Sequence, residues 1–148
     1  MSLQTDILFY RTIKRSSTIM AKIGNRLYNP AVDTPEENLE NIPIPYIVVM
    51  NQGTDNDDGS KDDIMESDYD NDAVDVLVVA ENRPALAELA NEVRVAIRKE
   101  ISSPTENTMQ LFGFEIQGYH FKASPVSSDI TTPCTFQTLS YICETLNI

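Results

Sequence analysis

The sequence predicts an α+β domain in which two main helices pack on one face of a four-stranded, mainly antiparallel sheet, in the order α-β-β-α-β-β. Three observations predict it. The chain has 148 residues, the size of one domain. Two pairs of strand-like segments lie before and after one long amphipathic pattern. A second amphipathic pattern precedes them all. We therefore expect residues 1–148 to form a single domain.

The first amphipathic pattern covers residues 3–23, where apolar side chains such as Ile7 and Leu8 recur at helical spacing. The run Ser16-Ser17-Thr18 interrupts this pattern, and we expect it to divide the helix into two pieces. Gly24 followed by an asparagine is a helix stop signal.

Two apolar segments predict the first strand pair. Residues 45–50 (PYIVVM) are rich in β-branched side chains, and a proline is tolerated at the first position of a strand. Residues 73–80 (AVDVLVVA) are nearly all apolar, so we expect both faces of this strand to be covered over much of its length. Three prolines between residues 25 and 44 favour an extended connector before the pair.

The strongest helix signal in the chain opens at Asn82-Arg83-Pro84. Asn82 or Arg83 serves as the N-cap, and Pro84 lies in the first turn, where its missing N–H costs nothing. The pattern ends near Ile101, before Ser102-Ser103-Pro104. One face is apolar throughout and consists of Leu86, Leu89, Ala90, Val93 and Ile97.

The second strand pair comes last. Residues 112–122 alternate, with Phe114, Ile116, Gly118 and His120 on one side and Glu115, Gln117, Tyr119 and Phe121 on the other. Residues 135–146 set Leu139, Tyr141 and Cys143 against Phe136, Thr138, Ser140 and Ile142. Residues 124–133 have loop composition. Because apolar residues occur on both sides of several strands, we expect the sheet face opposite the helices to meet a partner.

An acidic segment separates the first two strands. Residues 51–75, NQGTDNDDGSKDDIMESDYDNDAVD, hold ten acidic residues and one lysine, so they carry −9 of the chain's net charge of −12. An EF-hand loop needs glycine at position 6 and glutamate at position 12. With Asp55 first, Gly59 falls at position 5, and starting one residue earlier puts Thr54 first. We therefore expect an acidic, solvent-facing hairpin loop at about residues 52–72, with weak divalent-cation binding left open.

The sequence shows no catalytic pattern. His120 is the only histidine, and no glycine-framed serine or cysteine occurs. A Cys–His pair would need His120 to meet Cys134 or Cys143 in space. On one strand the two cysteines would be too far apart for a disulfide. The scattered glycines form no phosphate-binding loop. We therefore predict no enzyme activity, no cofactor, and no catalytic, cofactor-binding or metal-binding residues.

Charge and hydropathy also restrict the partners. Arg11, Lys14, Arg15, Lys22 and Arg26 are the nearest approach to a basic face, and a solvated helix face explains them better than a nucleic-acid contact. No signal-peptide pattern and no apolar run of membrane-spanning length are present. We expect an intracellular protein with no membrane contact and no specific nucleic-acid binding.

Several motifs resemble those of the phage tail-terminator or tail-completion family, which includes prophage minor tail proteins. In this sequence they read Arg26-Leu27-Tyr28, Ile44-Pro45-Tyr46-Ile47-Val48, VDVLV at residues 74–78 and AELANEVRVAI at residues 87–97. The resemblance covers about residues 5–146. The acidic segment at residues 51–75 is longer than the segment expected at this place in the family.

The resemblance implies a virion structural protein without enzymatic activity. Members of the family cap or complete the tail tube as a ring, often a hexamer, and join the tail to the head. For this chain it implies self-association, contacts with a tail tube protein and a head–tail connector protein, assembly in the host cytoplasm and a final place in the virion tail. The alternative is a small acidic binding module, weakly Ca²⁺-binding, without a phage role.

Overall fold

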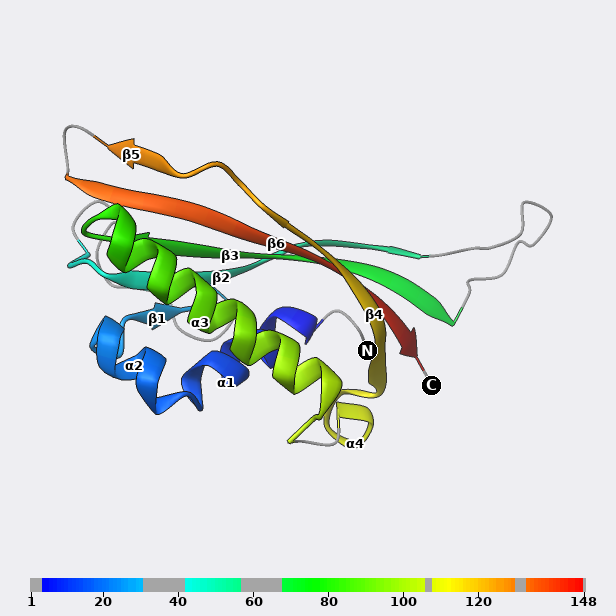
Figure 1. The fold of residues 1–148 in the computed structure, drawn as a ribbon. Helices are drawn as coiled ribbons and strands as arrows, with labels where there is room; N and C mark the ends of the chain where they lie inside the picture. The colour runs from blue at the N-terminus through cyan, green and yellow to red at the C-terminus, as the bar shows by residue number, and fades with distance from the viewer. Residues whose placement is uncertain (1–3, 31–41, 57–67, 106–107, 130–132, 148) are drawn as a thin grey trace.

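A computed structural model describes residues 4–30, 42–56, 68–105, 108–129 and 133–147, and it has the predicted α+β class (Figure 1). Helices lie on one face of a long, twisted sheet. The elements in chain order are α1 (Thr5–Lys14), α2 (Ser17–Ile23), β1 (Leu27–Tyr28), β2 (Tyr46–Asn56), β3 (Tyr69–Ala80), α3 (Arg83–Ser102), α4 (Thr108–Phe112), β4 (Phe114–Ala123), β5 (Ser127–Asp129) and β6 (Cys134–Asn147).

The described part of the sheet has six strands, where the sequence predicted four. The four long strands lie in the order β2-β3-β6-β4, and each neighbouring pair is antiparallel. The short β1 pairs in parallel with β2, and the short β5 pairs with the start of β6. Strands of two or three residues produce no alternating pattern, so the sequence predicted only connectors at these two places.

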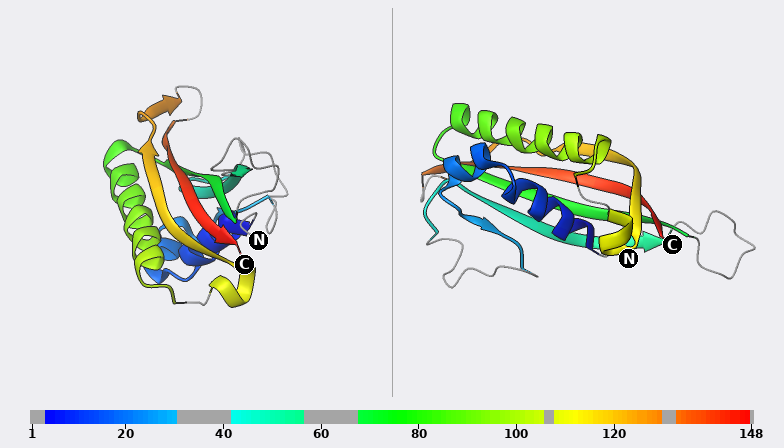
Figure 2. Two further views of the ribbon diagram at one scale, coloured as in Figure 1. Left: turned by 90° about the vertical axis from the view of Figure 1, so that its right-hand side faces the viewer. Right: turned by 90° about the horizontal axis from the view of Figure 1, so that it is seen from below.

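Four helices are described rather than two main ones. Ser16 divides the first into α1 and α2, as expected, and its hydroxyl caps α2 by accepting a hydrogen bond from the amide of Ile19 (3.3 Å). Gly24, with φ +57°, ends α2. The short α4 was not predicted, and it takes up Phe112, where the sequence placed the start of a strand. Figure 2 shows α1, α2 and α3 on the same side of the sheet.

The long helix α3 follows its sequence pattern closely. The side-chain oxygen of Asn82 accepts a hydrogen bond from the amide of Ala85 (2.9 Å), so Asn82 is the N-cap, and proline occupies the first turn. The five predicted apolar residues are all buried. This face packs on β3 and β6, which sets the outer face of α3 toward solvent.

The main core lies between the helices and the sheet. Its centre is Tyr141 on β6, whose ring contacts Phe9 of α1 edge-on (5.1 Å between centroids) and Phe121 of β4 (5.0 Å). Of the two sides predicted for β6, the one formed by Leu139, Tyr141 and Cys143 is buried here.

One predicted face assignment, on β4, is wrong. The register with β6 slips between Ile116 and Gly118, where an extra residue forms a bulge. Phe114 and Ile116 face the helices, and beyond the bulge Tyr119 and Phe121 share that face, so the predicted grouping of Phe114 and Ile116 with Gly118 and His120 is wrong. A strand has a side-chain period of two, so one inserted residue exchanges the two faces.

The first strand pair is longer than predicted. β2 continues to Asn56 and β3 begins at Tyr69, so both ends of the segment 52–72 are paired strands. Residues 57–67 lie outside the described residues. They include Lys61 and Gly59, the glycine whose position was compared with that of an EF-hand loop. Figure 1 shows this end of the sheet reaching beyond the end of α3.

Candidate functional site

A buried carboxylate marks the base of the acidic hairpin. Asp72 on β3 has no exposed surface. It accepts hydrogen bonds from the hydroxyls of Thr5 in α1 (2.5 Å) and Thr54 on β2 (2.6 Å). Burial raises the pKa of Asp72 because the charged form loses its hydration, although the two hydrogen bonds oppose the shift. Asp72 therefore joins the first turn of α1 to both arms of the hairpin.

The neighbouring buried polar groups also have partners. The side-chain amide of Asn29 donates to Asp6 (3.0 Å), and the hydroxyl of Thr145 lies 3.4 Å from the carbonyl of Asp70. Buried polar groups are stable when they are hydrogen-bonded in this way. The arrangement is therefore a structural network that fixes the hairpin to α1.

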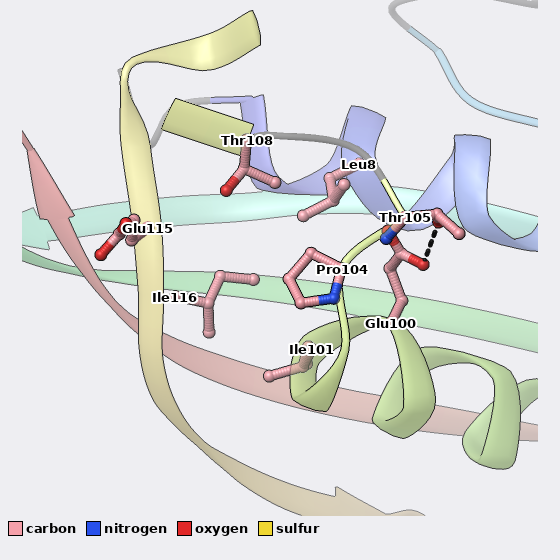
Figure 3. A pocket seen from close by; sticks show the side chains of 8 residues that line it. All are labelled: Leu8, Glu100, Ile101, Pro104, Thr105, Thr108, Glu115 and Ile116. Atoms are coloured by element: carbon pink, nitrogen blue, oxygen red, sulfur yellow. Dashed lines mark hydrogen bonds between the residues drawn. The ribbon is translucent and has the colours of Figure 1, made fainter. Parts of the chain in front are cut away.

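A cleft of about 450 Å³ opens where α1, the end of α3 and β4 meet (Figure 3). Glu100 at its rim accepts hydrogen bonds from the amide (2.9 Å) and hydroxyl (2.6 Å) of Thr105 and forms an ion pair with Arg15 (3.1 Å). These contacts occupy the carboxylate and close the turn after α3. The remaining lining is mixed: Leu8, Ile101, Pro104 and Ile116 are apolar, and Thr108 and Glu115 are polar.

The sheet face opposite the helices carries apolar residues in two places. Tyr46, Val48 and Val79 are buried there beneath Ile42. Near the hairpin, Ile142 is 49% exposed and helps to line a shallow hollow of about 350 Å³ with His120. The described helices α1, α2 and α3 lie on the other side of the sheet (Figure 2).

Three exposed residues in the second half of α3 are basic. Arg94, Arg98 and Lys99 are exposed, with Val95 (43% exposed) among them. The guanidinium of Arg94 lies over the ring of Phe121, 4.1 Å from its centroid. We did not predict these residues as a surface, because bases late in a helix are also explained by the helix dipole.

The N-terminal basic residues are partly used inside the protein. Lys22 contacts Glu88 (2.7 Å) and Glu92 (2.6 Å), and these hydrogen bonds raise its pKa. The side chain of Arg26 donates to the carbonyl of Pro45 (3.0 Å). Lys22 and Arg26 therefore have partners within the chain.

The structure does not bring the candidate nucleophiles to the histidine. Residue 119 pairs with Cys143, so His120 and Cys143 face opposite sides of the sheet. Cys134 lies at the other end of β6, about 30 Å from Cys143 at 3.3 Å per residue. Both cysteines are free thiols, as predicted. Burial raises the pKa of Cys143 to about 12, which makes it a poor nucleophile.

Two further classes of site were tested on the described residues. No group of three or more His, Cys, Asp or Glu side chains there is arranged to hold a metal ion. None of the helices described is long and apolar enough to cross a membrane.

The described residues thus form an α+β domain with a helical layer on one face of its sheet. No protein-family model matches the chain, and no curated protein matches it. Among solved structures, it is similar to a chain from the virion of a native gene transfer agent particle. The TM-score is 0.60 at 14% identity, with 94% of this chain and 92% of that chain covered. At this identity the likeness establishes the fold.

Proposed function

We propose that this chain is a structural protein of a phage-type tail, which caps or completes the tail tube and joins it to the head. The observation that carries this proposal is the fold likeness over nearly the full length of both chains, the other being part of a gene transfer agent virion. The motifs that resemble the tail-terminator family point to the same role. The protein acts through ring-like self-association and protein contacts, without catalysis or a cofactor.

The described surfaces support a protein that works by contact. The sheet face opposite the helices exposes Ile142, and the outer face of α3 exposes Val95 beside three cations. The buried carboxylates Asp72 and Glu100 are held by hydrogen bonds within the chain and have structural roles.

Electron microscopy of the protein mixed with the tube protein of the same gene cluster tests the proposal. We expect rings at the ends of tubes, and tubes that stop growing once capped. Tubes that grow unchanged and remain bare would contradict the tail role.

Light scattering with and without Ca²⁺ distinguishes the tail role from the alternative, a small Ca²⁺-binding module. A monomer that stays monomeric with tube protein and becomes more compact on adding Ca²⁺ is the behaviour of a calcium-binding module. A Ca²⁺-insensitive assembly supports the tail role.

A further inference from the structure

The strand β4 lies at one edge of the sheet. In the described part of the sheet, β6 pairs with one side of β4 and no strand pairs with the other. Beyond the bulge, residues 118–123 run in regular register with residues 139–144 of β6. The outer side of an edge strand presents backbone N–H and C=O groups that can pair with another strand. This stretch of β4 is therefore a place where the sheet can be extended.

Two arginines of α3 flank this edge on the helix side. α3 packs on β3 and β6, and β4 lies beyond β6. The guanidinium of Arg94 reaches over β4 and lies 4.1 Å from the centroid of the Phe121 ring. Arg98 follows one helical turn later, so it shares this flank of the helix. Burial raises the pKa of the Tyr141 hydroxyl, and the charges of Arg94 and Arg98 oppose that rise, in agreement with their position above this part of the sheet.

The opposite face of the same strand carries a further cation. Side chains alternate along a strand, so Lys122 points away from the helices while Phe121 points toward them. Lys122 is exposed. Among the residues that the structure describes, Arg94, Arg98 and Lys122 form no ion pair. The edge beyond the bulge therefore has positive charge on both of its faces.

We propose that the outer edge of β4, at residues 118–123, binds an extended acidic segment of a partner protein, which adds to the sheet as a further strand. Neighbouring strands lie about 4.8 Å apart, so the side chains of the added strand lie beside those of β4. One carboxylate then faces Arg94 and Arg98, and the next along the strand faces Lys122. The inference goes beyond the proposed function, because it concerns the chemistry of the bound segment whether or not the partner is a tail protein.

Charge disfavours the same edge of a second copy as the occupant. Two β4 strands paired edge to edge would bring Arg94 and Arg98 of one copy toward the same arginines of the other, and like charges that meet in this way repel. A bulge and a lysine are devices by which edge strands avoid pairing with their own kind. β4 has both, the bulge after Ile116 and the exposed Lys122. An acidic strand meets no such repulsion.

The geometry also disfavours single-stranded nucleic acid. Proteins that bind single strands stack the bases on aromatic rings. Here the guanidinium of Arg94 already lies over the ring of Phe121. The net charge of −12 on the whole chain opposes the approach of a phosphate backbone. A strand edge is matched instead by the regular row of amide donors and acceptors of a polypeptide.

Binding of a synthetic peptide to the ¹⁵N-labelled full chain tests the proposal by NMR. The probe is an acetylated peptide of about eight residues that alternates threonine and valine and has two adjacent glutamates at its centre. We expect it to shift the amide signals of residues 118–123 and to slow hydrogen exchange at the amides that face outward. A matched peptide with two lysines in place of the glutamates should bind at least about ten-fold more weakly.

A third peptide separates strand addition from the attraction of charges alone. It keeps both glutamates and carries N-methyl groups on all its central amides, so neither of its edges can donate hydrogen bonds to β4. We expect its binding to be lost. Equal affinity of the glutamate peptide and its methylated form, or of the glutamate and lysine peptides, would overturn the proposal.

Variants of α3 test the contact from the side of the protein. Arg94→Gln combined with Arg98→Gln should weaken binding of the glutamate peptide about ten-fold, because one carboxylate loses its cations. Arg83→Gln combined with Lys99→Gln is the matched control. It removes the same charge from exposed positions of the same helix, at its start and on its other flank, and should leave the affinity unchanged. Equal affinities of the two variants would contradict the proposed contact.

Other results would assign the edge to a different occupant and overturn the proposal. Hydrogen exchange of residues 118–123 that slows with rising protein concentration, without peptide, would assign the edge to a second copy. An oligothymidine that shifts the same amides as strongly as the glutamate peptide would assign it to nucleic acid. Peptide-induced shifts on β2 in place of β4 would assign binding to the opposite edge of the sheet. None of these results bears on the tail role, which the microscopy of rings and tubes tests separately.

Discussion

The carboxylate of Asp72 on β3 accepts a hydrogen bond from the hydroxyl of Thr5 in the first turn of α1, and neither residue has exposed surface. The two residues are 67 positions apart in the sequence. The same carboxylate also accepts from Thr54 on β2. One side chain thus fixes the helical layer to the base of the acidic hairpin, which makes it a sensitive point for stability.

Removing this carboxylate should destabilise the fold, whereas an amide should be tolerated. Asp72→Ala leaves the buried hydroxyl of Thr5 and the half-buried hydroxyl of Thr54 without this acceptor, and we expect a loss of about 1–3 kcal/mol in the free energy of unfolding. Asp72→Asn keeps an acceptor and removes a buried charge, so its loss should be smaller. Urea unfolding at pH 7 compares the two, and equal losses would contradict the hydrogen-bond explanation.

The titration of Asp72 should appear in the pH dependence of stability. Its pKa is raised on folding, chiefly by burial, so the folded state holds the proton more tightly than the unfolded chain. The resulting stabilisation is fully present below the ordinary aspartate pKa of about 3.9 and is lost as the pH rises through the raised value. Relative to Asp72→Asn, the wild type should lose stability from about pH 4 upward and then level off. A wild-type advantage that grows with pH would contradict this sign.

The N-cap of α3 should contribute measurably to stability. Asn82→Ala removes the acceptor for the amide of Ala85, and we expect a cost of about 1 kcal/mol. Asn91→Ala is the matched control, because Asn91 is exposed in the middle of the same helix and alanine is the better helix former. Thermal unfolding should show a lower Tm for the first variant only.

The centre of the core should depend on ring packing and not on the tyrosine hydroxyl. Tyr141 is buried, and its hydroxyl has no hydrogen-bond partner among the described residues. Tyr141→Phe should therefore be neutral or stabilising. Phe9→Ala removes the ring that meets Tyr141 edge-on and should cost about 3–5 kcal/mol. Chemical denaturation measures both, and a large loss in Tyr141→Phe would show that the hydroxyl has a partner.

The two thiols should react at very different rates in the folded protein. Cys143 is fully buried and its pKa is raised to about 12, whereas Cys134 is half-buried. A thiol reagent at pH 8 should label one cysteine quickly and the second only in denaturant. In Cys134→Ser the fast phase should disappear. A fast phase that persists in that variant would place the reactive thiol at Cys143.

Local patterns predicted much of the fold. The apolar spacing and the Asn82 cap located α3, and the alternation along β6 located its buried face. In contrast, β1 and β5 are too short to leave a periodic signal and are held by pairing with β2 and β6. The bulge after Ile116 exchanged the faces of β4, because register depends on the partner strand.

The sequence by itself determined the α+β class, the two-piece first helix, the boundaries of α3 and the concentration of acid between β2 and β3. These features depend on neighbours in the chain, through helix spacing, capping and local charge. Only the tertiary structure decided that Asp72 meets Thr5, that His120 and Cys143 face opposite sides, and that the guanidinium of Arg94 lies over the ring of Phe121. These relationships join residues far apart in sequence, and strand register and helix packing alone bring such residues together or keep them apart.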